Sequence, residues 1–193
     1  MQTQFFLTTD PTLFAEYCEL RNRVFRHHYP HLPSDFGRPD MIDRHSHIVV
    51  GYDYRVVAGG RITISRPESP QPLPMEEAGL RLADRVPEFL LDRESYAEFS
   101  RVVVDPAYAT GRQCSLGLIQ ALAHTAAGFG IDLVFSICPD PQVRWNAANS
   151  RKCGVTFHTF PEIEIPTPFG IRMTLCAYTG LIAAFGRFLG RTA

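Results

Sequence analysis

Three polar residues stand at the start of an otherwise apolar segment in the middle of the chain. Residues 98–104 read EFSRVVV, and a strand buried on both faces would normally be almost entirely apolar. Because successive side chains of a strand point to opposite faces, Glu98 and Ser100 would share one face and Arg101 would lie on the other. A buried carboxylate is costly unless it is paired or takes part in a reaction. The pattern therefore indicates either a catalytic Glu98 or a solvated glutamate at the end of a strand.

Two further pairs of residues could bind a charged ligand. Arg21 and Phe25 are four residues apart and would share one face of a helix, although a surface arginine beside a core phenylalanine has the same spacing. Asp40 and Asp43 lie close together in a polar segment before a strand, and two carboxylates suit a cationic or ammonium group. The alternative for the aspartate pair is a turn, which aspartate side chains commonly stabilise.

The histidines are concentrated near the N-terminus, and five of the seven fall between residues 27 and 47. His27 and His31 have the spacing of a metal-binding pair on a helix. However, Pro30 would break the helix between them, and the sequence has no HExxH motif. We therefore predict no metal site, and a metal-dependent hydrolase is the alternative that these histidines leave open.

The pattern of apolar residues predicts the elements that must position these side chains. Strands and helices alternate, with hairpins in the first half, which favours an α/β fold with about six or seven strands in a mixed, mostly antiparallel central sheet flanked by helices. We expect a single domain over residues 1–193. The expected helices cover residues 10–30, 76–91, 142–153 and 181–189, with another after residue 111 that ends near 128 or 130. The expected strands cover residues 47–52, 55–65, 96–104, 133–138, 155–160 and 172–178. Between the first helix and the first of these strands lies a long loop, of a kind that is often functional or mobile.

The composition argues against several classes of protein. With 193 residues, of which 45% are hydrophobic, the chain can bury a sizeable core. A net charge of −1 argues against a protein that binds nucleic acid. Five cysteines without a CxxC motif indicate reduced thiols and a cytoplasmic location. We expect no signal peptide, because the first ten residues have no basic segment followed by an apolar run. Glycines and an arginine interrupt the apolar residues near the C-terminus, so we also expect no stable membrane insertion.

Five motifs occur in an order that points to a known family. They are Leu20-Arg21-Asn22-Arg23-Val24-Phe25, Asp40-x-x-Asp43, Gly60-Arg61, Leu82-Ala83-Asp84 with Pro87-Glu88-Phe89-Leu90, and Glu98-Phe99-Ser100-Arg101. In this order they resemble the acyl-homoserine-lactone synthases, the bacterial autoinducer synthases of quorum sensing. The resemblance covers about residues 13 to 160 and implies a GCN5-related N-acyltransferase-like fold. The loop motif Arg112-x-x-Ser115-x-Gly117 also loosely resembles the loop that holds pantetheine and pyrophosphate in that fold, although an ordinary strand–loop–helix connection fits it as well.

By this resemblance, the protein transfers a fatty acyl group from acyl carrier protein to the amine of S-adenosylmethionine. Lactone closure then releases methylthioadenosine. The implied partners are acyl carrier protein and the small-molecule amine acceptor, with coenzyme A as the alternative carrier of the acyl group. We expect no resident cofactor.

The resemblance also assigns roles to individual residues. The catalytic residues would be Glu98, Ser100 and Arg101, with Glu98 taking the proton of the attacking amine. The substrate-binding residues would be Arg21, Phe25, Asp40, Asp43 and Arg61. We expect the two aspartates to hold the positive charge of the acceptor, and Arg61 and Arg101 to offer a carboxylate their fork of donors.

The acyl group needs two further features. The oxyanion of the reacting thioester needs fixed donors, which backbone N–H groups near residues 102–104 could supply. The acyl chain needs an apolar slot, for which Val102 and Val104 are candidates, with Ser136 near its floor. The same valines could equally be ordinary core residues.

One position departs from the family pattern. The family usually has a tryptophan six residues after the phenylalanine of the first motif, in the cap over the adenosyl group, and this chain has His31 there. A related group with the same fold, the N-acyl amino acid synthases, acylates free amino acids and is the alternative. A non-catalytic relative that binds an acyl group or another ligand is also compatible with the fold.

Overall fold

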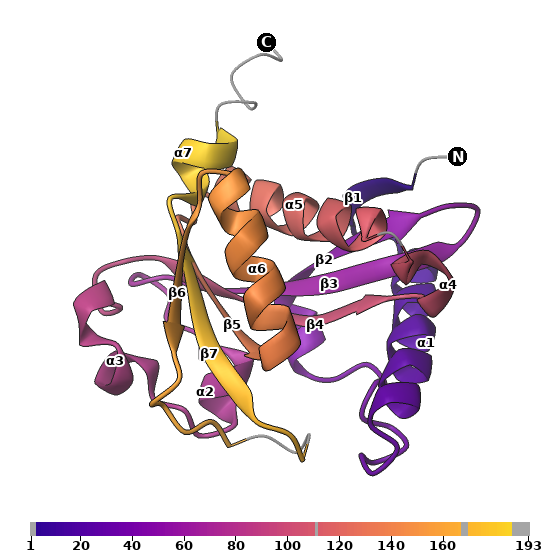
Figure 1. The fold of residues 1–193 in the computed structure, drawn as a ribbon, viewed down its shortest axis with the longest axis horizontal. Helices are drawn as coiled ribbons and strands as arrows, with labels where there is room; N and C mark the ends of the chain where they lie inside the picture. The colour runs from indigo at the N-terminus through magenta and orange to yellow at the C-terminus, as the bar shows by residue number, and fades with distance from the viewer. Residues whose placement is uncertain (1–2, 111, 167–169, 187–193) are drawn as a thin grey trace. The chain divides into compact units, whose positions relative to one another are not determined.

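The computed structural model describes residues 3–110, 112–166 and 170–186 (Figure 1). Within those residues, seven strands form one sheet in the order β1-β2-β3-β4-β5-β7-β6. The strands are β1 (Gln4–Thr8), β2 (Ser46–Tyr52), β3 (Val56–Ser65), β4 (Tyr96–Val104), β5 (Leu133–Pro139), β6 (Thr156–Phe160) and β7 (Met173–Thr179). Strand β4 runs parallel to β5, whereas β1 with β2, β5 with β7, and β6 with β7 are antiparallel. The expected α/β class and mixed sheet are confirmed.

Helices and short helical turns connect these strands. The α-helices are α1 (Pro11–His28), α2 (Pro74–Glu77), α3 (Leu82–Arg85), α4 (Pro106–Ala109), α5 (Gln113–Gly128), α6 (Asp140–Lys152) and α7 (Leu181–Phe185), and the 3-10 helices are η1 (Ile42–His45) and η2 (Pro87–Phe89). Among the described residues, no helix is long and apolar enough to span a membrane.

The chain divides into two compact units. The first unit consists of Met1–Ile62 and Phe99–Ala123, and the second of Thr63–Glu98 and His124–Ala193. The boundaries fall inside β3, β4 and α5, so single elements run from one unit into the other. Strand β4 therefore carries Glu98 in the second unit and Ser100 in the first. A single domain over residues 1–193 stays a prediction.

In the first unit, α1 packs against β2. The side chain of Asp10 caps the helix by accepting a hydrogen bond from the backbone N–H of Thr12 at 2.7 Å, and Pro11 occupies the first helical position, where no N–H is needed. The buried face of the helix meets apolar residues of the sheet, and this core consists of Tyr17, Cys18, Leu20, Val24, Ile48, Val50, Val56 and Val103. The helix thereby has a fixed position against the strands of its own unit.

The strand β1 was not expected from the sequence. It pairs antiparallel with β2, with Phe6 opposite Val50. The ring of Phe5 fits into space left by two glycines, because a Cβ atom at Gly51 or Gly117 would lie 2.6 or 2.5 Å from that ring. Gly117 of the Arg112-x-x-Ser115-x-Gly117 motif therefore has a packing role, which no sequence period could reveal.

In the second unit, α2, α3 and η2 replace the single helix expected over residues 76–91. Gly79 has φ +103°, which ends α2, and Pro87 cannot donate the hydrogen bond that would continue α3. The apolar residues of this segment nevertheless enter a shared core with β4, β5 and β7, which includes Leu73, Leu80, Leu82, Val86, Leu91, Tyr96, Phe135 and Leu175. The apolar residues of this segment are thus buried, but the single helix expected over residues 76–91 is wrong.

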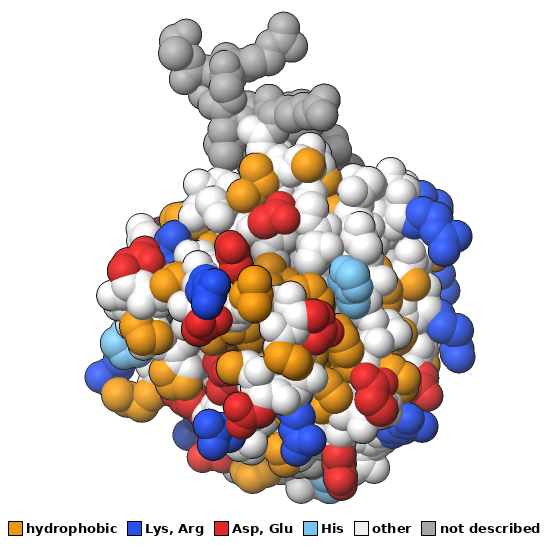
Figure 2. Space-filling view, turned by 90° about the vertical axis from the view of Figure 1, so that its left-hand side faces the viewer, with side chains coloured by type: hydrophobic (Ala, Val, Ile, Leu, Met, Phe, Trp, Pro, Cys, Tyr) orange, Lys and Arg blue, Asp and Glu red, His pale blue; other side chains and the backbone are white. Residues whose placement is uncertain are grey.

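Two other expectations differ near loops and at the C-terminus. Helix α4 was not expected, although Asp105 caps it by accepting a hydrogen bond from the N–H of Ala107 at 3.0 Å. The last helix was expected to reach residue 189 and is described for Leu181–Phe185, so Phe188 and Leu189 lie outside the described residues. Figure 2 shows acidic, basic and apolar side chains intermixed on one face, in keeping with the near-neutral net charge of −1.

The loop between α1 and η1 is packed closely against α1. A Cβ atom at the buried Gly37 would lie only 2.2 Å from the Cα atom of Asn22, so the loop backbone touches the helix backbone. Only glycine allows this close approach. The middle of the loop is therefore packed against α1, whereas the sequence led us to expect a functional or mobile loop.

Gly37→Ala is expected to lower the free energy of unfolding by about 1–3 kcal/mol, because the new methyl group forces the loop away from α1. Urea unfolding followed by circular dichroism measures the change. Ser34→Ala, at an exposed position of the same loop, is the matched control and should change stability by less than about 0.5 kcal/mol. Equal stability of both variants would show that the loop is not packed against α1 as described.

Candidate active site

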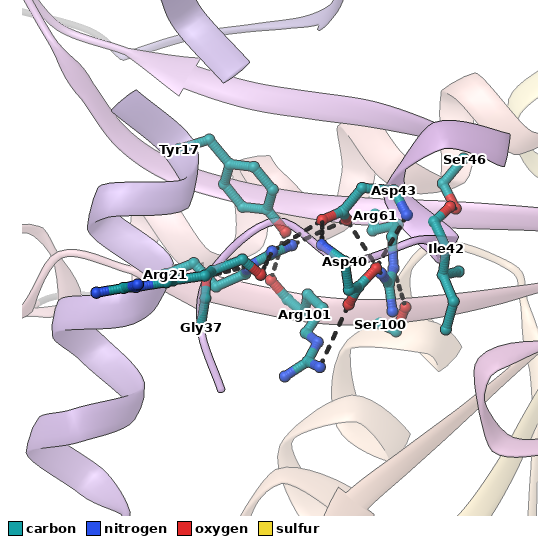
Figure 3. Close-up of polar contacts among 11 residues, drawn as sticks. Tyr17, Arg21, Gly37, Asp40, Ile42, Asp43, Ser46, Arg61, Ser100 and Arg101 are labelled. Carbon is teal, nitrogen blue, oxygen red and sulfur yellow. Dashed lines mark hydrogen bonds and ion pairs between the residues drawn. The ribbon is translucent and has the colours of Figure 1, made fainter. Parts of the chain in front are cut away.

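A buried carboxylate in the first unit pairs with two guanidinium groups (Figure 3). Arg21 of α1 is completely buried and binds Asp43 of η1 through two parallel hydrogen bonds, Nη1 to Oδ1 and Nη2 to Oδ2, each 2.9 Å long. Arg61 of β3 is 1% exposed, and its Nη1 donates to the same Oδ1 at 3.0 Å. Asp43 therefore joins a helix to a strand, and a bidentate pair fixes the orientation of both partners.

The remaining donors of Arg21 bind the loop. Its Nε donates to the carbonyl oxygen of Gly37 at 2.7 Å, and Nη2 also donates to the carbonyl oxygen of Arg38. All three nitrogens of this guanidinium group thus have partners. Arg21 therefore holds the loop in place rather than presenting a free charge to a ligand.

Asp40 completes the network on the side of Arg61. Arg61 Nη1 donates to Asp40 Oδ1 at 2.7 Å, and Arg61 Nε donates to the hydroxyl of Ser100 on β4 at 3.0 Å. The two aspartates also brace each other, because the N–H of Asp40 donates to Asp43 Oδ2 and the N–H of Asp43 donates to Asp40 Oδ1. Both carboxylates thus neutralise arginines of the protein, whereas the sequence led us to expect that they hold the charge of a substrate.

Arg101 interrupts the regular strand β4. Its φ of +54° lies in the left-handed region, which costs a non-glycine residue energy and is concentrated at functional sites. The hydroxyl of Tyr17, a completely buried residue of α1, donates to the carbonyl oxygen of Arg101 at 2.9 Å. The guanidinium carbon lies 4.1 Å from the ring centre of Phe36 and 5.5 Å from that of Phe25. Helix α1 and the loop together therefore hold this strained residue in place.

The charges of the network shift the pKa values of its members. Burial alone would raise the pKa of Asp43, but the hydrogen bonds and charge of Arg21, the N–H of Asp40 and the charge of Arg61 outweigh it and lower that pKa. Burial raises the pKa of Tyr17 to about 12 despite the nearby arginines, so its hydroxyl stays protonated and can donate. Burial and the charges of Arg61 and Arg21 lower the pKa of Arg101.

The other predicted residues lie in separate surroundings. Glu98 is 2% exposed, and its Oε2 accepts a hydrogen bond from the backbone N–H of Met75 in α2 at 2.9 Å, within the second unit. Ser136, also in the second unit, is buried and lies 3.3 Å from the hydroxyl of Tyr178. Val102 and Val104 of the first unit are partly buried. The structure thus brings together Arg21, Phe25, Asp40, Asp43, Arg61, Ser100 and Arg101 in one unit.

A second buried polar cluster surrounds Ser136. Asn146 of α6 donates through Nδ2 to the hydroxyl of Tyr178 at 2.8 Å and to the sulfur of Cys138 at 3.4 Å. Burial raises the pKa of Tyr178 well above its usual range, so this hydroxyl stays protonated. Ser136 is therefore part of a hydrogen-bonded core between α6, β5 and β7.

Sequence reasoning missed Tyr17, Phe36 and Gly37. A signal for Tyr17 exists, because Tyr17, Arg21 and Phe25 follow one another at four-residue spacing along α1. No local pattern marks Phe36 or Gly37, since their contacts come from the packing of the loop. Among the described residues, no group of three or more histidine, cysteine, aspartate or glutamate side chains is placed to hold a metal ion.

Asp43→Asn is expected to destabilise the protein at neutral pH by about 3–5 kcal/mol, because it leaves two buried guanidinium groups without their shared charge. The pKa of the Asp43 carboxyl is lower in the folded protein than the unfolded value of about 3.9, so the charged carboxylate stabilises the fold above that pH. This stabilisation is lost as the pH falls through the lower pKa of the folded state. The stability difference between wild type and variant should therefore be constant above about pH 5 and shrink in acid below about pH 4.

Urea unfolding at several pH values measures this difference. Asp92→Asn, which removes an exposed ion pair with Arg93, is the control and should cost less than about 1 kcal/mol. A difference between wild type and Asp43→Asn that does not change with pH would contradict the assigned role of the carboxylate.

No protein-family model matches the chain, and no curated protein matches its sequence. Solved structures do match it over nearly its whole length. A CoA-dependent acyl-homoserine lactone synthase, BjaI, solved with SAM and isopentyl-CoA, is 17% identical with a TM-score of 0.67, and the match covers 100% of this chain and 90% of BjaI.

Two other matches represent related activities. FeeM, an N-acyl amino acid synthase from uncultured soil microbes, is 9% identical with a TM-score of 0.70 and 99% coverage of both chains. The AHL synthase LasI is 16% identical with a TM-score of 0.61, and the match covers 95% of this chain and 96% of LasI. At these identities the likeness establishes the fold, and this chain has the GCN5-related acyltransferase-like fold of the acyl-homoserine-lactone synthases.

Proposed function

We propose that this protein is an acyltransferase that moves a fatty acyl group from a thioester to the amine of S-adenosylmethionine and so makes an acyl-homoserine lactone. The observation that carries the proposal is the buried network of Arg21, Asp43 and Arg61, extended by Asp40, Ser100 and Arg101. These residues come from distant motifs of the chain, and the motifs are those that resemble the autoinducer synthases. A network of this kind on an acyltransferase fold supports the same reaction here.

In the proposed reaction, Glu98 removes the proton from the ammonium group of the acceptor, directly or through one water molecule. An ammonium group has no lone pair, so it cannot attack a thioester until a base takes a proton. The hydrogen bond from the Met75 N–H orients the Glu98 carboxylate. General base catalysis of this kind contributes about 10²–10⁴-fold to the rate.

The free amine then attacks the thioester carbonyl, and the carbonyl oxygen becomes an oxyanion. We assign its stabilisation to backbone N–H groups near residues 102–104, which follow the left-handed Arg101. A fixed donor of this kind contributes about 2.7–4 kcal/mol to the stability of the transition state. Collapse of the intermediate forms the amide bond and releases the thiolate of the donor. Lactone closure then forms the ring and releases methylthioadenosine.

The aromatic residues beside Arg101 support an adenosyl acceptor. Phe25 lies 5.5 Å from Phe36 and 6.2 Å from Tyr29, measured between ring centres. Flat apolar rings of this kind can stack on an adenine base. The ring of Tyr29 lies 6.4 Å from that of His31, which stands where the family has a tryptophan.

The thioester donor is proposed to be acyl carrier protein, with acyl-CoA as the alternative. BjaI is described as CoA-dependent, which supports testing both carriers. Both carriers, like S-adenosylmethionine, are cytoplasmic compounds, and none of the five cysteines, all of which lie in the described part of the chain, forms a disulfide, so we propose a cytoplasmic location.

Acylation of a free amino acid is the second candidate function. The structural match to the N-acyl amino acid synthase FeeM, with a TM-score of 0.70, favours it, as does His31 in place of the tryptophan. The two functions share the thioester, the base and the oxyanion, and differ in the acceptor and in the lactone closure that follows only with S-adenosylmethionine.

Glu98→Gln is expected to reduce kcat by at least about 100-fold, because the amide keeps the shape of the side chain but cannot accept a proton. The assay follows thiol release with saturating acceptor and acyl donor. Glu88→Gln, at an exposed glutamate of η2, is the control and should retain wild-type activity. Activity of Glu98→Gln within a few-fold of wild type would contradict the assignment of the base.

Mass spectrometry of extracts from cells that overexpress the protein distinguishes the two acceptors. We expect acyl-homoserine lactones in these extracts and none in extracts of cells that express Glu98→Gln, because only the active base allows the amine to react. Accumulation of N-acyl amino acids instead would identify the second function. If purified protein releases no thiol from either donor with S-adenosylmethionine or any amino acid, the acyltransferase proposal is wrong.

A further inference from the structure

The carboxylate of Glu98 is held by the single helical turn α2. Proline occupies the first position of this turn, so Pro74 has no N–H and Met75 supplies the first N–H of the helix itself. The Met75 N–H donates to Glu98 Oε2 at 2.9 Å, and both residues are buried. The orientation of the proposed base therefore depends on whether α2 keeps its shape.

A helix of four residues needs further contacts to keep its shape. In α2 these contacts come from Glu76. Its Oε2 accepts a hydrogen bond from the N–H of Leu73 at 3.0 Å, and its own N–H donates to the carbonyl oxygen of Leu73 at 2.8 Å. The side chain of Glu76 thus reaches back to the start of the helix, as glutamate does in a capping box. The two hydrogen bonds enclose Pro74 and Met75 and so fix the direction of the Met75 N–H.

Strand β4 contacts α2 at two positions on one face. Tyr96 and Glu98 are two residues apart, so their side chains point to the same side of the strand. The hydroxyl of Tyr96 donates to Glu76 Oε2 over a long 3.5 Å, while Glu98 accepts from Met75. Burial raises the pKa of Tyr96, so its hydroxyl stays protonated beside the carboxylate. Glu76 therefore both closes α2 and contacts the strand that carries the base, and all of these residues belong to the second unit.

We propose that Glu76 is a positioning residue for the base and acts on Glu98 through α2 and the N–H of Met75. This inference rests on the proposed function, because it assumes that Glu98 takes the proton of the acceptor. An N–H that points at a carboxylate favours the ionised form of that carboxylate. Loss of the contact between Glu76 and Leu73 should therefore leave fewer molecules with an ionised, correctly oriented base at a given pH.

Glu76→Ala and Glu76→Gln separate the capping hydrogen bond from the charge. Both variants remove the negative charge, but glutamine can still accept the N–H of Leu73, whereas alanine cannot. The test is the dependence of kcat on pH, measured by thiol release with saturating acceptor and acyl donor. We expect Glu76→Gln to keep kcat within about threefold of wild type, and Glu76→Ala to have a kcat about 5- to 20-fold lower than Glu76→Gln, with KM nearly unchanged. The acid limb of the kcat profile of Glu76→Ala should lie about 0.5–1 pH unit above that of Glu76→Gln.

The control variant is Glu77→Ala, at an exposed glutamate of the same turn, and it should behave as the wild type does. Circular dichroism measures the folded fraction of each variant, since a merely structural role would lower that fraction without moving the acid limb. If Glu76→Ala does not fold, Glu76→Asp takes its place with the wild type as reference, because it keeps the charge on a shorter side chain and should show the same shift.

The outcomes distinguish this inference from the proposed function. Equal kcat and equal acid limbs in the two variants compared, with Glu98→Gln inactive, would overturn the role of Glu76 and leave the proposed function intact. If the wild type releases no thiol from either donor with any acceptor tested, the proposed function fails and this inference fails with it.

Discussion

Asp43 is shared by two arginines that are almost completely buried, and the arrangement of the first unit depends on keeping both of them paired. Removing a guanidinium group from water is costly, and an unpaired one would destabilise the fold by several kcal/mol. Arg21 therefore uses all of its nitrogens, and in doing so it binds the carbonyl oxygens of Gly37 and Arg38. This electrostatic requirement, together with apolar packing, holds the loop against α1.

The same network also explains how Arg101 can adopt a strained conformation. A left-handed arginine within a strand persists only where its surroundings determine it. Here Tyr17 binds its carbonyl oxygen, while Asp40 and two aromatic rings hold its side chain. A buried ion network adds little stability compared with a well-packed apolar core. Its value in this protein is positional, because it holds the Arg101 guanidinium group with one nitrogen, Nη1, that no described residue pairs.

Strand β4 connects this network to the proposed base. The second unit contains Glu98 and the first contains Ser100 and Arg101, and a single strand carries all three. The left-handed φ of Arg101 comes after Glu98 and Ser100 and directly before the backbone N–H groups of residues 102–104. One covalently continuous element thus bears the proposed base and the backbone proposed to stabilise the oxyanion.

The sequence alone was sufficient to predict the α/β class, most strands and the cap of α1, because periodic apolar residues and capping residues are local properties. It singled out Arg21, Asp43 and Arg61 through the family resemblance, and as residues that bind substrate, whereas the structure pairs them with one another. It did not predict β1, since Phe5 is held by glycines at 51 and 117, or the division of residues 76–91, where Gly79 interrupts an apolar pattern. It also could not show that Arg61 donates to both aspartates of the protein. Whether an arginine is saturated by the protein or keeps a free nitrogen depends on contacts between distant segments, and only the tertiary structure decides those contacts.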